Sequence, residues 1–265
     1  MMRRNVPALL AFGLILVVAA CDQLTKPLPL DPYGFMVMNA RVKGAGVYTT
    51  QPTAFFYKSY QVNLASAGAA WDSCRVYPYD ATATSAGGTY LPAGTSLGVS
   101  VSGRADVLTP ASTATPGPYN MATAGLIFIP GDTVRLTIPG DKNGFPASTV
   151  VAKTAEPFTV DPLVTPSLGQ GMPLKWSAPT DNNSAMLFTF LYSNSGGSTA
   201  NEEIYCSYFD NGQDSVPAYL MNKYVVSPVK SALVQRLRTV IYDVPGTKAT
   251  FNVISTFDRP LPVSP

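Results

Sequence analysis

The chain has 265 residues, of which 46% are hydrophobic and 13% are charged, with 24 prolines, 3 cysteines and no histidine. The apolar content excludes an intrinsically disordered chain, because disordered segments are poor in hydrophobic residues and rich in charge. The lack of histidine excludes Ser-His-Asp and Cys-His catalysis, histidine-ligated zinc and histidine-ligated haem.

The first 20 residues predict an export signal that is removed from the mature chain. Arg3 and Arg4 supply positive charge, and the uncharged run 6–20 that follows is 15 residues long. This run is shorter than the roughly 20 residues that a membrane-spanning helix needs. We therefore interpret residues 1–20 as a signal peptide.

The end of this segment, Val18-Ala19-Ala20-Cys21, places small residues directly before a cysteine. It resembles the lipobox of bacterial lipoproteins, in which the cysteine becomes the acylated first residue of the mature chain. The resemblance implies that Cys21 carries lipid and that the proline-rich segment 21–34 is a tether. It also implies the bacterial cell envelope, either the outer membrane or the periplasmic face of the inner membrane. An ordinary secretory signal followed by a coincidental cysteine is the alternative.

Removal of residues 1–20 takes away two arginines and leaves 16 basic and 16 acidic residues, so the mature chain has no net charge. Nucleic-acid binding depends on clustered lysine and arginine, so the sequence predicts no nucleic-acid partner. A neutral surface attracts anionic headgroups weakly, so we expect acylated Cys21 to make the contact with the lipid bilayer. An envelope protein or a glycan is the other partner that this location implies.

Two cysteines remain, Cys74 and Cys206, which lie 132 residues apart in sequence. An even number of cysteines in an exported chain favours a disulfide between them. Two buried free thiols are the alternative, because the sequence does not give the distance between the two residues.

The rest of the sequence predicts an all-β chain, because short runs rich in Val, Thr, Phe and Tyr are separated by Pro and Gly. In residues 134–138 apolar and polar side chains alternate, which is typical of a strand with one wet face. A Pro-Gly turn precedes a strand three times, beginning at Pro92, Pro130 and Pro245. One short helix is expected at 217–224. The predicted strands are 35–42, 54–64, 97–102, 125–129, 134–138, 149–153, 174–176, 186–192, 203–208, 233–242 and 249–257.

Strands without helical crossovers predict two tandem antiparallel β-sandwich domains after the signal peptide, residues 35–162 and 163–265. The junction is the Pro- and Gly-rich segment 161–171. The start of the second domain, with Trp176 and Pro179, resembles the second strand of a fibronectin type III domain. The turn 245–247 resembles a turn of the same family. The resemblance implies immunoglobulin-like sandwiches.

Two short motifs match catalytic patterns without their chemical context. Residues 94–98 fit G-x-S-x-G around Ser96, but a strand follows and no histidine exists to accept the proton. Ser227 and Lys230 fit S-x-x-K, but Pro228 interrupts the helical turn that would bring them together. We therefore predict no catalytic residue and no enzyme activity.

Three acidic loops, 141–144, 181–184 and 210–214, offer carboxylates and amides near glycine or asparagine. Calcium requires six to eight oxygen ligands, and each loop alone supplies too few of them. The same residues are common in β-turns. The sequence therefore predicts no metal and no cofactor.

Tyrosines that lie close in sequence are the remaining candidates for a binding site, because exposed aromatic rings stack on sugars or contact protein partners. Tyr57 and Tyr60 form one such pair. The candidate ligand-binding residues are Tyr77, Tyr79, Tyr205 and Tyr208. The alternative is that these tyrosines fill the faces of a sandwich, since tyrosine is a good strand former.

These observations predict a membrane-anchored lipoprotein that acts as a non-catalytic binding, adhesion or scaffolding module of the cell envelope. One alternative is a carbohydrate-binding protein that uses tyrosine platforms and Ca²⁺. Another is a glycosidase, which would need two carboxyl groups about 5–10 Å apart, drawn from Glu156, Glu202, Glu203 and 13 aspartates.

Overall fold

A computed structural model describes residues 31–44, 46–58, 72–79, 89–122, 125–181, 183–261 and 263–264. The predicted signal peptide, Cys21 and the tether up to residue 30 lie outside the described residues. The prediction of an all-β chain is confirmed, because strands dominate the described residues and α2 (Ala218–Val226) is the one helix among them. Within this part of the chain, no helix combines the length and the apolar character that crossing a bilayer requires.

Most of the strands belong to one large sheet. Its hydrogen-bonded order is β10-β9-β5-β6-β7-β3-β1-β17-β16-β13-β14-β4, with β2 paired to β1 and β8 paired to β2. The strands are β1 (Tyr33–Gly44), β2 (Val47–Thr50), β3 (Thr53–Tyr57), β4 (Ser73–Pro78), β5 (Leu97–Val101), β6 (Arg104–Pro110), β7 (Tyr119–Met121), β8 (Leu126–Phe128), β9 (Thr133–Ile138), β10 (Ser148–Lys153), β13 (Ser184–Tyr192), β14 (Glu202–Phe209), β16 (Lys230–Asp243) and β17 (Thr250–Leu261).

Two small sheets accompany the large one. One pairs β11 (Leu163–Val164) with β18 (Val263–Ser264), and the other pairs β12 (Met172–Lys175) with β15 (Gln213–Val216). The short strands β2, β4, β6, β7, β11, β15 and β18 were not expected from the sequence. The expected turns are present, and Gly94, Gly131 and Gly246 all have positive φ.

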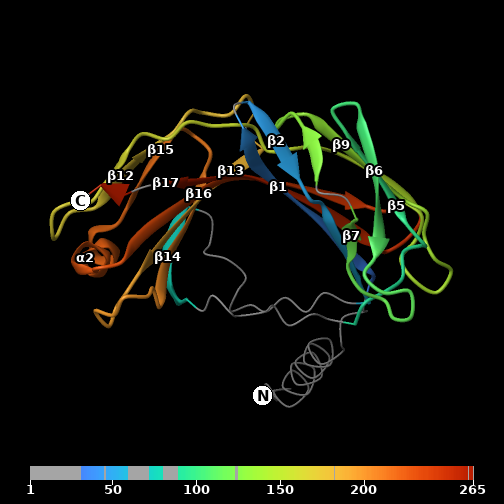
Figure 1. The fold of residues 1–265 in the computed structure, drawn as a ribbon, viewed down its shortest axis with the longest axis horizontal. Helices are drawn as coiled ribbons and strands as arrows, with labels where there is room; N and C mark the ends of the chain where they lie inside the picture. The colour runs from blue at the N-terminus through green and yellow to red at the C-terminus, as the bar shows by residue number, and fades with distance from the viewer. Residues whose placement is uncertain are drawn as a thin grey trace, which may run out of the picture. The chain divides into compact units, whose positions relative to one another are not determined.

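The large sheet crosses the predicted domain junction. β1 pairs in parallel with β17, from Tyr33 opposite Thr250 to Ala40 opposite Phe257, and β17 pairs in turn with β16 (Figure 1). Residues from 32 to 265 form one compact unit. The division into two immunoglobulin-like domains is therefore not confirmed and stays a prediction.

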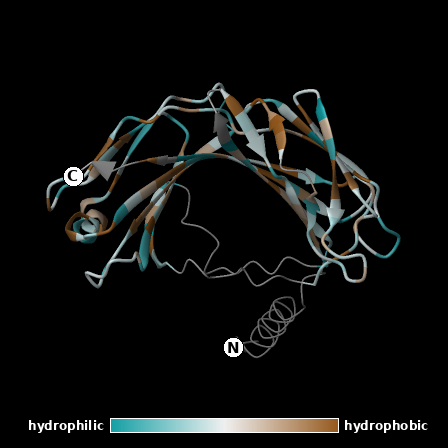
Figure 2. Ribbon diagram, viewed as in Figure 1, coloured by the Kyte–Doolittle hydropathy of each residue, from teal (hydrophilic) through white to brown (hydrophobic). Residues whose placement is uncertain are grey.

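The two sides of the sheet differ because successive side chains of a strand point to opposite faces. We call the side that carries the buried residues the first face, and Figure 2 shows apolar and polar residues alternating along the strands. The first face includes five residues that are 0% exposed: Met36 of β1, Phe251 of β17, Val234 of β16, Phe188 of β13 and Cys206 of β14.

Different elements cover the first face at its two ends. Towards β14, Trp176 after β12 packs 5.4 Å from the ring of Phe188, and Tyr224 of α2 packs 5.5 Å from Phe190. Towards β3, the rings of Phe56 and Phe145 lie 4.8 Å apart. In β9 the alternation that the sequence predicts is present, with every second residue from Val134 to Ile138 buried.

A buried ion pair lies on the first face between β14 and β16. Arg236 and Asp210 have side chains that are 1% and 0% exposed, and Arg236 Nε lies 2.7 Å from Asp210 Oδ2. Trp176 Nε1 donates to Asp210 Oδ1 at 2.8 Å, and Ser184 Oγ donates to Oδ2 at 2.6 Å. The carboxylate therefore joins β13, β16 and the segment after β12.

The other nitrogens of the Arg236 guanidinium bind the segments that contain Pro157 and Ser177. Arg236 Nη1 donates to the carbonyl of Pro157 at 3.0 Å, and Nη2 donates to the carbonyl of Ser177 at 2.5 Å. Its guanidinium carbon lies 5.3 Å from the ring centroid of Phe158. Both charges are thus surrounded by partners, which a buried ion pair needs to offset its lost hydration.

We expect Asp210→Asn to lower the free energy of unfolding by about 3–5 kcal/mol, because it leaves the Arg236 charge buried without its counter-ion. Urea unfolding measures the change. Asp161→Asn is the matched control, since Asp161 is exposed and its hydrogen bond to Lys175 uses only the backbone. Equal stability of the two variants would contradict a stabilising role for the pair.

Candidate functional site

The side of the sheet opposite the core, which we call the second face, carries a row of aromatic rings on β1, on β3 and at Tyr90, which pairs with Tyr57 in an isolated bridge. Phe35 and Phe55 stack with their centroids 4.8 Å apart, and Phe55 lies 6.4 Å from Tyr57 with the rings nearly parallel. Tyr33 lies 6.0 Å from Phe35, and Tyr90 stacks 4.8 Å from Tyr57. We call these five residues the aromatic row. Tyr57 is 7% exposed and the others are partly exposed.

Strand register builds this row. Phe35 lies opposite Phe55 and Tyr33 lies opposite Tyr57, while residues two apart on a strand share a face. The sequence prediction missed Phe35 and Phe55 because it considered tyrosines alone. The spacing of two between Tyr33 and Phe35, and between Phe55 and Tyr57, was the available signal. Tyr60 lies outside the described residues.

The second face also carries two of the four predicted tyrosines, at the β4 end of the sheet. Tyr77 and Tyr205 meet edge to face with their ring centroids 6.5 Å apart. The register places Glu203 opposite Tyr77 and Arg75 opposite Tyr205. We call these four residues the β4 corner. Strand pairing therefore joins residues that are more than a hundred positions apart in sequence.

The β4 corner contains a carboxyl group that no described residue neutralises. Glu203 makes no hydrogen bond or ion pair within the described residues, and burial raises the pKa of its carboxyl group. Burial, followed by the charges of Glu203 and Tyr77, raises the pKa of Tyr205. The corner thus offers two ring surfaces and a hydrogen-bond acceptor whose capacity is unused among these residues.

The other two predicted tyrosines occupy different surroundings. Tyr208 is 2% exposed on the first face, where its ring lies 6.0 Å from Phe188 and its hydroxyl donates to the carbonyl of Ser215 at 2.9 Å. Tyr79 follows β4, is partly exposed and donates its backbone N–H to the carbonyl of Asn201 at 2.9 Å. Tyr77 and Tyr205 are therefore the pair that the structure brings together.

A disulfide joins Cys74 of β4 to Cys206 of β14, with an S–S distance of 2.09 Å. The two cysteines lie directly opposite each other in the antiparallel pairing. The Tyr208 hydroxyl lies 2.8 Å from the Cys74 sulfur. Since β4 is the last strand of the sheet order and pairs with β14 alone among the described strands, the bond fixes the strand that carries Arg75 and Tyr77.

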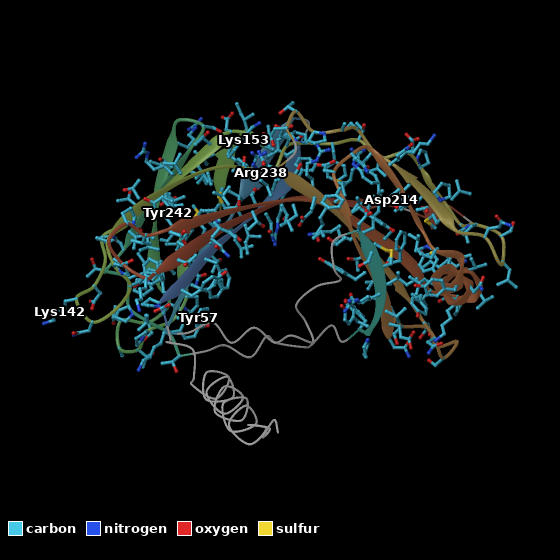
Figure 3. The ribbon with its side chains drawn as sticks, turned by 180° about the vertical axis from the view of Figure 1, so that it is seen from behind. Tyr57, Lys142, Lys153, Asp214, Arg238 and Tyr242 are labelled. Atoms are coloured by element: carbon cyan, nitrogen blue, oxygen red, sulfur yellow. A yellow bond between two sulfur atoms is a disulfide. The ribbon has the colours of Figure 1, made fainter. Side chains whose placement is uncertain are left out.

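The acidic loops form ion pairs rather than a cluster of carboxylates. Arg238 Nη1 donates to Asp181 at 2.7 Å, and Lys153 Nζ lies 3.2 Å from Asp181 and 2.5 Å from Glu156 (Figure 3 labels Lys153 and Arg238). Asp210 belongs to the buried pair with Arg236. Within the described residues, no group of three or more Asp, Glu or Cys side chains is placed to hold a metal ion.

These contacts lower the pKa values of two carboxyl groups. Burial opposes ionisation of Glu156, but hydrogen bonds from Lys153 and Thr180 outweigh it and lower the pKa to about 2. The hydrogen bond from Arg238 holds the pKa of Asp181 well below its ordinary value. Both groups are therefore ionised at neutral pH and held by cations.

The serines of the two catalytic-type motifs, Ser96 and Ser227, lie at the ends of secondary-structure elements. Ser96 directly precedes β5, so a strand follows it as the sequence predicts. Ser227 accepts a hydrogen bond from Ser193 N at 2.9 Å and donates to the carbonyl of Val229 at 2.7 Å. Its hydroxyl thus connects the end of α2 to the end of β13.

Of the glutamates, Glu202 accepts a hydrogen bond from the Tyr192 hydroxyl and another from Asn194 Nδ2 at 2.7 Å. Its neighbour Glu203 points to the opposite side of β14, because successive strand residues alternate. The two carboxyl groups therefore do not face a common cleft.

Comparison with known proteins adds no relative. No family model matches the chain, and no curated protein or solved structure shows significant similarity to it.

We expect the stability contributed by Glu156 to depend on pH. Because its folded pKa of about 2 lies below the ordinary 4.5, the contribution is complete above pH 5 and is lost as the pH falls towards 2. Urea unfolding at pH 6 and pH 3 should show that Glu156→Gln costs about 1–2 kcal/mol at pH 6 and less at pH 3. A cost that is the same at both pH values would contradict the ion-pair explanation.

We expect reduction of the Cys74–Cys206 bond to lower the free energy of unfolding by about 2–4 kcal/mol, since the bond closes a long loop in the unfolded chain. Urea unfolding with and without reductant, with thiol counting by mass spectrometry, measures this change. The Cys74→Ser, Cys206→Ser double variant should match the reduced protein and should not respond to reductant.

Proposed function

We propose that this chain is an exported lipoprotein, acylated at Cys21, whose β body is a non-catalytic binding, adhesion or scaffolding module of the bacterial cell envelope. The observation that supports binding is the gathering of partly exposed aromatic rings on the second face. The support for export and acylation is the sequence of residues 1–21 and its resemblance to a lipobox.

Aromatic rings that are already ordered suit a binding surface. They bury a large area on contact and lose little side-chain entropy, because stacking with their neighbours already restricts them. Four residues of the aromatic row and all four of the β4 corner lie on regular strands, so strand pairing sets the spacing of these rings before a partner arrives.

The charge balance fits recognition by contact rather than by long-range attraction. The mature chain has 16 basic and 16 acidic residues, and four of these charges neutralise one another around Asp181. Electrostatic steering is weak for such a surface. We therefore propose that partner binding through the second face depends little on ionic strength.

Anchoring is tested by metabolic labelling of the native host with an alkyne fatty acid. We expect label on the wild-type chain and none on Cys21→Ser, because that thiol is the proposed acylation site. The wild-type chain should also sediment with membranes, while Cys21→Ser should be released in soluble form. Unlabelled wild-type chain would contradict the proposed anchor.

Binding is tested with purified Cys21→Ser chain and isolated envelopes from a host strain that lacks the protein. We expect the added change Tyr77→Ser with Tyr205→Ser to weaken binding at least tenfold, since two adjacent interface rings contribute more than about 1.4 kcal/mol. Tyr219→Ser is the matched control, because Tyr219 is 71% exposed on α2, outside the second face.

Urea unfolding of each variant separates a loss of contact from a loss of fold. Equal binding by the double variant and the control would contradict a role for the β4 corner. Steep weakening by salt would contradict recognition by contact.

A further inference from the structure

A pocket of about 230 Å³ lies outside the aromatic row and the β4 corner, where the segment before β5 meets the β6–β7 connection. Pro92 and Thr95 line it from the first segment, and Pro110, Thr113 and Thr115 line it from the second. Tyr119 of β7 completes the wall. Two chain segments and a strand therefore shape it together.

Hydrogen bonds hold the first wall of this pocket in place. The Tyr119 hydroxyl accepts from Ala93 N at 2.8 Å and donates to the carbonyl of Gly94 at 2.8 Å. The carbonyl of Pro92 accepts from Phe145 N at 2.8 Å. Because these bonds use the Tyr119 hydroxyl and the residue is 2% exposed, Tyr119 offers the pocket no free polar group.

Hydrogen bonds within the β6–β7 connection hold the second wall of the pocket. Ala111 N donates to the carbonyl of Pro118 at 2.9 Å, which joins the two ends of the β6–β7 connection. Ala114 N donates to Ser112 Oγ at 3.2 Å within it. The bond between Ala111 and Pro118 therefore holds the two ends of this wall together, which restricts the conformations that a ligand would have to order.

The lining chemistry points to a neutral ligand with several hydroxyl groups. No lining residue is charged, so an ion would lose hydration without gaining a counter-charge. Thr95, Thr113 and Thr115 are exposed, and their hydroxyls make no hydrogen bond within the described residues, so each is free to donate to a ligand and to accept from it. The rings of Pro92, Pro110 and Pro116 supply apolar contact for C–H groups.

We infer that this pocket binds one neutral sugar unit of an envelope glycan. Its volume lies below the roughly 300–1,000 Å³ of pockets that enclose drug-sized ligands, so a single ring fits better than a longer ligand. A sugar ring offers hydroxyls to the threonines and C–H faces to the prolines. The inference rests on the proposed function as an envelope-binding module and names the ligand class of a second site.

Saturation-transfer NMR with the full-length Cys21→Ser chain tests the inference, with glucose, galactose, mannose and N-acetylglucosamine as neutral probes and glucuronate as the charged probe. We expect at least one neutral sugar to bind and glucuronate to bind more weakly. Thr95→Val and Thr113→Val should each raise the Kd about fivefold to tenfold, because each removes a hydroxyl and keeps the shape. Thr149→Val, on the exposed side of β10, should leave the Kd unchanged.

Three results would overturn the inference: no neutral sugar binds, binding survives both threonine changes, or a proline-rich peptide displaces the sugar and binds more tightly. Urea unfolding of each variant confirms that it is folded. Failure here leaves the proposed function standing if the Tyr77 and Tyr205 variant still loses envelope binding. If the Tyr77 and Tyr205 variant binds envelopes normally, the proposed function itself is contradicted.

Discussion

The pairing of Arg236 with Asp210 is the constraint on which the packing of the first face depends. Two charges buried at 1% and 0% exposure are costly unless every polar neighbour is satisfied. The partners come from β13, β16, the end of β14 and the segments beside Pro157 and Ser177. A shift of any one of these elements would remove a hydrogen-bond partner or the counter-ion from a buried charged group. The pair therefore helps to fix the positions of the segments at Pro157 and Ser177 against the sheet.

With one face committed to the core, the other face is available for contact. The same alternation that buries Met36 and Phe251 turns Phe35 and Tyr33 to the opposite side. Register then stacks the rings of Phe35 and Phe55, from separate strands, with their centroids 4.8 Å apart. The spacing of Phe35 and Phe55 thus follows from regular strand geometry, and not from a loop that must be ordered.

The sequence was sufficient for features set by neighbouring residues. The alternation of 134–138, the Pro-Gly turns and a helix near 217 depend on local chemistry, and each is present. It was insufficient where long-range pairing decides. Asp210 looks like a turn residue until Arg236 is placed beside it. Tyr205 and Tyr208 look alike in sequence, yet an odd spacing on β14 puts them on opposite faces.

The parallel pairing of β1 with β17 has a consequence for the time at which the body can fold. Tyr33 and Asn252 share a hydrogen bond across 219 residues of sequence, so β1 and β17 cannot pair until almost the entire polypeptide has been synthesised. Contacts this distant slow folding, because a large loop must close first.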